Sequence, residues 1–191
     1  MPILDHFSWF APYYDRLIKP GDAEKMLALL QLSSSTRVLD VGGGTGRSAE
    51  MARLRTSHIL IADLSPAMLA QAAAKGFQVT AAASEALPFP AGAFDRVIMV
   101  DALHHVCDQP QTARELWRVL APGGKIVIEE FNLHVLWVKW IALAEKLALM
   151  RSHFLNPLQI AALFAGAPAD ASIQIETEGA TVWVIVTRLA H

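Results

Sequence analysis

The chain has 191 residues, of which 53% are hydrophobic and 18% are charged. This length and composition predict one compact domain that folds alone, and they exclude an intrinsically disordered chain. Sixteen Lys and Arg against eighteen Asp and Glu give a formal net charge of -2, and the basic residues are scattered along the sequence. Because no basic stripe is present to follow a phosphate backbone, we expect no nucleic acid as a partner.

The sequence also carries signals about the compartment. The single cysteine, Cys107, excludes an intramolecular disulfide and a cysteine-based metal site. Residues 1–10 lack the basic start and long apolar core of a secretory signal, and three charged residues interrupt the apolar stretch Leu133 to Met150. These features predict a cytoplasmic protein with no bound metal and no stable membrane insertion. Monomer and homodimer both remain open.

After the first thirty residues, short β-branched runs alternate with longer helical stretches, which predicts parallel strands joined by crossover helices. The expected strands are Arg37 to Val41, His58 to Ala62, Lys75 to Ala82, Phe94 to Asp101, Lys125 to Glu130, Ala171 to Glu178 and Thr181 to Leu189. The expected helices are Gly46 to Arg55, one that starts at Ser65 as N-cap with Pro66 first, Gln109 to Leu120, Leu133 to Met150 and Pro157 to Phe164.

Turn residues divide these elements. Gly76 stops the second helix, and the turn Pro122-Gly123-Gly124 is expected to open the fifth strand. Only Gly179 and Ala180 separate the last two strands, which is too short for a crossover, so these strands should be antiparallel. The predicted fold class is α/β: a Rossmann-like, doubly wound sheet of seven strands, mostly parallel, with an antiparallel C-terminal strand.

The strongest motif is the strand and turn from Val38 to Arg47, which reads VLDVGGGTGR. Its glycines would let a ligand approach the backbone, and the helix that follows would present unpaired N–H groups. Asp63 ends the second expected strand, where a carboxylate can accept both hydroxyls of a ribose. A tight turn without a ligand, and a helix-start charge at Asp63, remain as alternatives.

Four separated blocks carry a resemblance to a known family. They are Val38 to Arg47, Ile61 to Leu69, Ser84 to Asp95 followed by Leu103 to Val106, and Leu120 to Ile128, with a weaker fifth block at Phe10 to Asp15. On these residues the chain resembles the class I S-adenosylmethionine-dependent methyltransferases, and within them the ubiquinone and menaquinone C-methyltransferase-like branch, the methyltransferase type 11 domain. The fold predicted above is the one that this resemblance implies.

The resemblance implies S-adenosylmethionine as the cofactor and a role for each matching residue. Asp40, Gly42, Gly44 and Gly46 would hold its methionine end, Tyr14 would close over that end, and the backbone at Asp101 would line the other side. Asp63 would take the ribose hydroxyls, and Leu64 would pack on the adenine. The family often has Asp where this chain has Ala83, so adenine recognition falls to the backbone or to Ser84, and Glu85 of the same element completes the expected set.

The acceptor side gives weaker signals. His104 and His105 follow the fourth expected strand, and His104 is our candidate for a base that takes a proton from the acceptor, while a purely loop-shaping role is the alternative. Glu129, Glu130 and Asn132 end the fifth strand, where they either orient an acceptor or lie in solvent. The Trp-rich stretch from Trp137 to Ala148 either covers an apolar acceptor pocket, lies on a membrane surface or packs on the sheet.

We therefore expect methyl transfer to a small-molecule acceptor held in line with the sulfonium methyl. Residues 1–191 would form a single methyltransferase domain: an N-terminal helical lid (1–36), a cofactor-binding core (37–131), and substrate-side helices with a terminal β-hairpin (132–191). Two alternatives are an NAD(P)-dependent oxidoreductase on a similar sheet, which the absence of G-x-G-x-x-G disfavours, and a non-catalytic methyltransferase-like binding subunit.

Overall fold

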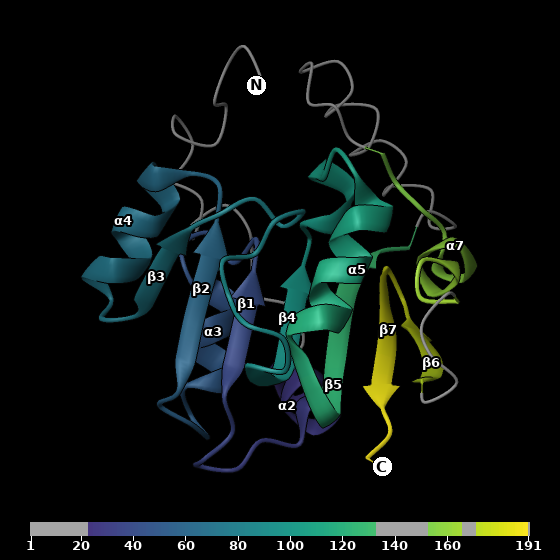
Figure 1. The fold of residues 1–191 in the computed structure, drawn as a ribbon, viewed down its shortest axis with the longest axis horizontal. Helices are drawn as coiled ribbons and strands as arrows, with labels where there is room; N and C mark the ends of the chain where they lie inside the picture. The colour runs from purple at the N-terminus through teal and green to yellow at the C-terminus, as the bar shows by residue number, and fades with distance from the viewer. Residues whose placement is uncertain (1–22, 133–152, 166–170, 191) are drawn as a thin grey trace.

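The computed structural model describes residues 23–132, 153–165 and 171–190 (Figure 1). Helices alternate with strands as far as β3, β4 follows β3 directly, and helices again precede β5 and β6. The helices are α2 (Ala23–Leu30), α3 (Arg47–Ala52), α4 (Pro66–Ala74), the 3-10 helix η1 (Leu103–His105), α5 (Gln109–Val119) and α7 (Pro157–Ala162). The strands are β1 (Val38–Val41), β2 (Ile59–Asp63), β3 (Gln78–Ala81), β4 (Phe94–Val100), β5 (Leu120–Phe131), β6 (Ala171–Glu178) and β7 (Thr181–Arg188).

The seven strands form one sheet in the order β3-β2-β1-β4-β5-β7-β6. Strands β1 to β5 pair in parallel, whereas β7 runs antiparallel to both β5 and β6. This arrangement confirms the predicted fold class and the antiparallel terminal hairpin. Because parallel strands end at the same edge, the carboxyl ends of β1, β2, β4 and β5 meet there, and ligands of doubly wound sheets bind at this edge.

Helices cover both faces of the sheet, and each face has its own core (Figure 1). Helices α5 and α7 pack on one face, through residues such as Leu116 and Ile160. Helices α2, α3 and α4 pack on the other, through residues such as Met26 and Ala49. Alternation along the strands serves both cores, so Leu39 of β1 faces α5 and Val38 faces α2. This double burial explains the nearly continuous apolar runs in the central strands.

Three local expectations differ from the structure. Helix α3 begins at Arg47 rather than Gly46, because Gly46 has a left-handed φ of 84° and serves as the N-cap. Strand β5 begins at Leu120, so the prediction that Pro122-Gly123-Gly124 precedes it was wrong; these residues form an irregularity within the strand, where the pairing with β4 shifts register. Ser65 is the N-cap of α4, but its side chain makes no capping hydrogen bond.

Several expected features lie outside the described residues. They are Tyr14 with most of the proposed N-terminal lid, the helix from Leu133 to Met150, and the Trp-rich stretch within it. In the portions of the chain that the structure does describe, no helix combines the length and apolar character needed to cross a membrane.

Candidate cofactor and acceptor site

The glycine-rich loop between β1 and α3 is held in shape by the protein itself. Gly42, Gly44 and Gly46 all have positive φ angles, of 68°, 54° and 84°. The Gly42 N–H donates to the Ala62 carbonyl at 2.7 Å, and the Gly46 N–H donates to the Gly43 carbonyl at 2.8 Å. The loop conformation is therefore stabilised before any ligand is present.

The glycines are required for different reasons. A Cβ at Gly42 would lie 2.6 Å from the Ala102 Cβ, and one at Gly46 would lie 2.9 Å from the Ile61 Cδ1. Among the described residues, the atoms nearest to a Cβ at Gly44 would be 4.0 Å away. Packing thus excludes side chains at Gly42 and Gly46, whereas the described residues leave room at Gly44 for a ligand to approach the backbone.

Asp63, at the end of β2, fastens this loop to the next one. Its Oδ2 accepts a hydrogen bond from the Gly44 N–H at 2.9 Å, and its Oδ1 accepts from the Ser65 N–H at 2.7 Å. A carboxylate oxygen can accept more than one hydrogen bond. Asp63 therefore lies beside Gly44, and its contact with ribose hydroxyls stays a prediction.

Asp40 is the most unusual group of the loop. Its carboxylate is fully buried beneath Gly43, and neither oxygen has a hydrogen bond of normal geometry to a described residue. Burial first, and the charge of Asp63 second, raise the pKa of Asp40 to about 7, although the Ala49 backbone N–H and the Arg47 guanidinium offset part of this rise. Gly43 itself was missed by the sequence reasoning: a Cβ there would lie 2.5 Å from the Asp40 Cγ.

An ion pair between Arg47 and Asp101 links the loop to the end of β4. The Arg47 Nη2 donates to the Asp101 Oδ2 at 3.1 Å, and the two side chains are only 12% and 18% exposed. Asp101 has a left-handed φ of 51°, and burial followed by repulsion from Glu130 raises its pKa to about 6. The sequence reasoning assigned only a backbone role to Asp101 and none to Arg47, because no local pattern joins positions 54 residues apart.

The three residues expected around the adenine lie in different environments. Leu64 is 66% exposed, which leaves its side chain accessible to a flat apolar ring. The Ser84 hydroxyl instead contacts the Thr112 hydroxyl of α5 at 3.0 Å, and Glu85 accepts from the Asp108 N–H at 3.3 Å. Ser84 and Glu85 thus tie their loop to the start of α5, and their contact with adenine stays a prediction.

His104 is paired with Glu130 on the α5 face of the sheet. The His104 Nδ1 lies 2.6 Å from the Glu130 Oε2, and the His104 backbone N–H donates to the Glu130 Oε1 at 3.3 Å. The two side chains are 2% and 5% exposed. His105 is partly buried, and this burial lowers its pKa to about 3. The Glu130 carboxylate is thus the partner of the His104 ring.

The neighbouring Glu129 points to the opposite face, where its Oε2 accepts from the Trp183 Nε1–H at 3.0 Å. Both glutamates are 4% exposed, so the alternative that they are solvated charges at the strand end was wrong. Asn132 anchors the terminal hairpin, because its Nδ2 donates to the Gly179 carbonyl at 3.1 Å.

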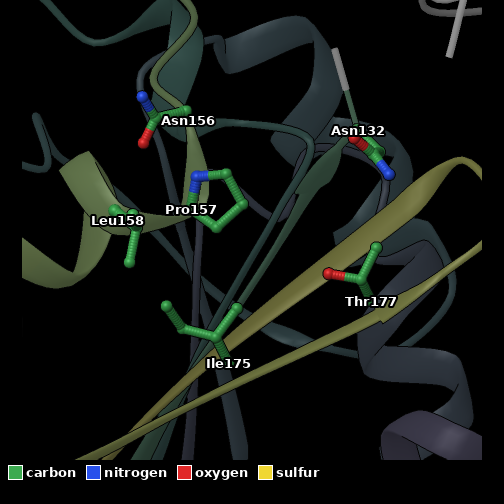
Figure 2. Close-up of a pocket in the computed structure, with 6 residues that line it drawn as sticks. All are labelled: Asn132, Asn156, Pro157, Leu158, Ile175 and Thr177. Atoms are coloured by element: carbon green, nitrogen blue, oxygen red, sulfur yellow. The ribbon is translucent and has the colours of Figure 1, made fainter. Parts of the chain in front are cut away.

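A mostly apolar cavity of about 340 Å³ lies beyond the end of β5 (Figure 2). Its walls come from Asn132, from the start of α7 and from two residues of β6, as the labelled side chains in Figure 2 show. The residues are Asn132, Asn156, Pro157, Leu158, Ile175 and Thr177. None of the expected cofactor residues lines it. Among the described residues, no group of His, Cys, Asp and Glu is arranged to hold a metal ion.

These features fit S-adenosylmethionine. The described residues leave room for a ligand to approach the Gly44 backbone, the Asp63 carboxylate lies beside it, and the next residue, Leu64, offers an exposed apolar side chain. The loop is that of a cofactor cradle at the carboxyl edge of a parallel sheet.

Comparison with known proteins agrees. Residues 39–128 match the methyltransferase domain family. A demethylmenaquinone methyltransferase of Thermus thermophilus is 37% identical over 140 residues, which cover 65% of this chain and 64% of that protein. The ubiquinone/menaquinone biosynthesis C-methyltransferase UbiE of Pasteurella multocida is 35% identical over 111 residues, covering 52% of this chain and 41% of that protein. The matches thus span less than two thirds of these relatives.

The fold comparison points the same way. The crystal structure of a SAM-dependent methyltransferase from Thermotoga maritima, described as a possible histamine N-methyltransferase, superposes with a TM-score of 0.77 at 21% identity and covers 95% of this chain and 97% of that one. The match over residues 39–128, the sheet topology and the glycine-rich loop together resemble a class I S-adenosylmethionine-dependent methyltransferase domain. Within that class, the matched residues are similar to those of the ubiquinone and menaquinone C-methyltransferases.

Proposed function

We propose that this protein transfers the methyl group of S-adenosylmethionine to a small-molecule acceptor of the hydroxylated aromatic, quinone-like class. The observation that carries the proposal is the cradle in which Gly44 leaves open space beside the Asp63 carboxylate. The acceptor class is supported by the two quinone methyltransferases that the chain resembles. The division into a lid, a cofactor core and a substrate side, and a cytoplasmic setting, belong to the same proposal.

The rival functions fit less well. A dinucleotide-binding oxidoreductase places a pyrophosphate on a G-x-G-x-x-G turn, whereas this loop is fixed by hydrogen bonds from Gly42 and Gly46 in a G-x-G-x-G spacing. A domain that binds no cofactor would have no need for the left-handed Gly44 beside open space, because its packing does not require glycine there.

Calorimetric titration with S-adenosylhomocysteine and, separately, with NAD+ tests the cofactor. Wild-type protein should bind S-adenosylhomocysteine alone, and Asp63→Asn should weaken that binding at least about tenfold, since the charge that accepts the ribose hydroxyls is lost. Asp95→Asn is the matched control, because Asp95 pairs with Arg37 at the opposite edge of the sheet. Binding of NAD+ alone, or equal losses in both variants, would contradict the proposal.

Turnover is tested next with a panel of small hydroxylated aromatics and reduced quinones. The expected result is formation of S-adenosylhomocysteine together with a methylated product, detected by mass spectrometry. Cofactor binding without turnover on any member of the panel would favour the non-catalytic binding subunit instead.

A further inference from the structure

The pair Glu130 and His104 has a geometry that loop packing alone does not require. One carboxylate receives two groups of the same residue, the Nδ1 at 2.6 Å and the backbone N–H at 3.3 Å. Both side chains are at least 95% buried. An ionised carboxylate only accepts hydrogen bonds, so the short contact of an ionised Glu130 places a proton on the His104 Nδ1.

The surroundings fix the His104 ring in place. The Phe154 ring stacks on it with centroids 4.4 Å apart and planes 12° apart, and the His105 ring lies 4.0 Å away. The His153 N–H donates to the His104 carbonyl at 2.7 Å, while the Gln109 amide donates to the His153 carbonyl at 2.7 Å. A histidine held by η1, β5, α5 and the segment before α7 has little rotational freedom.

This pair lies close to the cofactor loop. Glu130 and His104 both act electrostatically on Asp101, and Asp101 pairs with Arg47, which directly follows Gly46. Electrostatic interactions through Asp101 and Arg47 therefore connect His104 with the glycine-rich loop. Neither partner of the His104 pair contributes to the cradle around Gly44.

We propose that Glu130 is a positioning residue that holds His104 as the Nδ1–H tautomer, so that Nε2 is the basic nitrogen that takes a proton from a hydroxyl group of the acceptor. The tautomer rests on the short contact with an ionised Glu130 and not on the proposed methyl transfer. The catalytic step rests on the proposed methyl transfer, and it narrows the acceptor to one whose reaction requires loss of a proton.

With a phenolic acceptor, atoms and charges are conserved in the methyl transfer. When bound, S-adenosylmethionine supplies a methyl group activated by its sulfonium. The acceptor O–H gives its proton to the His104 Nε2, and the oxygen or an adjacent ring carbon then bonds to the methyl carbon. The S–CH₃ bond breaks with its electron pair on sulfur, which gives S-adenosylhomocysteine; after attack by carbon, the displaced ring proton leaves to solvent. Glu130 stabilises the imidazolium formed on His104.

Nitrogen NMR of histidine-labelled protein tests the tautomer without cofactor or acceptor. The His104 signals, assigned by their loss in His104→Gln, should show a protonated Nδ1 and an unprotonated Nε2. Glu130→Gln should shift His104 toward the Nε2–H tautomer, since an amide can donate to Nδ1. Glu129→Gln is the matched control, because Glu129 faces Trp183 on the other side of the sheet. An Nε2–H tautomer in the wild type, or no shift in Glu130→Gln, would overturn the assignment.

Kinetics test the catalytic step. With weakly acidic phenols, Glu130→Gln should lower kcat on the order of 10²-fold with little change in KM, and the loss should shrink for phenols that are already ionised at the assay pH. A merely structural role would give the same loss across the series and would be matched by Glu129→Gln, which would overturn the proposal. If the wild type fails to bind S-adenosylhomocysteine, the proposed function fails, while the NMR result still decides the tautomer.

Discussion

Substituting the two glycines at positions 44 and 46 separates the cofactor role of the loop from its packing role. Both have left-handed φ angles, of 54° and 84°, so an alanine at either position costs roughly 1–2 kcal/mol of backbone strain. At Gly46 the new Cβ would also lie 2.9 Å from the Ile61 Cδ1 and 3.0 Å from two atoms of the Phe77 ring. Such overpacking adds roughly 1–3 kcal/mol.

Gly46→Ala should therefore lower the free energy of unfolding by about 2–5 kcal/mol, whereas Gly44→Ala should lower it by only about 1–2 kcal/mol. For a chain of this length, the Tm should fall by roughly 2–4 °C for each kcal/mol. The order reverses for ligand binding: Gly44→Ala should weaken S-adenosylhomocysteine at least about tenfold, because its Cβ would occupy the open space beside Asp63.

Urea unfolding and calorimetric titration on the same two preparations measure both quantities. Gly44→Ala that binds S-adenosylhomocysteine as tightly as the wild type would refute the placement of the cofactor over Gly44. Gly46→Ala that is no less stable than Gly44→Ala would refute the assignment of Gly46 to packing against Ile61 and Phe77.

Three further substitutions test individual groups. Because its folded-state pKa is raised to about 7, Asp40 contributes stability at low pH that is lost as the pH rises from about 4 to about 7. Asp40→Asn should remove this loss. In urea unfolding, the free energy of unfolding of the variant should exceed that of the wild type by up to about 4 kcal/mol at about pH 8 and by little at about pH 4. Arg47→Met should lower the free energy of unfolding by about 3 kcal/mol at about pH 8, where Asp101 is left charged and unpaired. The loss should be smaller at about pH 5, because the raised pKa of Asp101 lets this carboxyl take a proton. An equal loss of stability at both pH values would contradict the ion pair. Leu64→Asp should change the Tm by no more than about 2 °C, since the side chain is 66% exposed, yet weaken S-adenosylhomocysteine about tenfold; unchanged affinity would remove Leu64 from the adenine site.

Much of the cofactor side was predictable because its requirements are local. A left-handed φ selects glycine, so Gly42, Gly44 and Gly46 were visible from residue type alone. Asp63 was visible because an acidic residue after a buried strand falls at the ligand-binding edge. The two-residue connection likewise predicted the hairpin of β6 and β7.

The acceptor side was less predictable because it depends on register. Side chains alternate between the faces of a strand, so the roles of Glu129 and Glu130 follow from the pairing of β5 with its neighbours. The irregularity near Gly123 shifts the pairing of β5 with β4. The turn residues predicted that the strand begins only after this point, whereas it begins at Leu120. The sequence alone consequently did not distinguish the two glutamates, although Glu129 accepts a hydrogen bond from Trp183 and Glu130 pairs with His104.

The adjacent glutamates show how one strand end serves two purposes. Glu129 satisfies the indole N–H of Trp183, which pairs with it across β5 and β7, and this contact stabilises the α2 face of the sheet. Glu130 turns toward η1 and orients His104. Its charge also raises the pKa of Asp101, the partner of Arg47 at the cofactor loop. Since the charges of both groups act on Asp101, a change of charge at His104 or Glu130 must alter the ion pair between Asp101 and Arg47. This electrostatic coupling links the proposed acceptor side with the proposed cofactor loop.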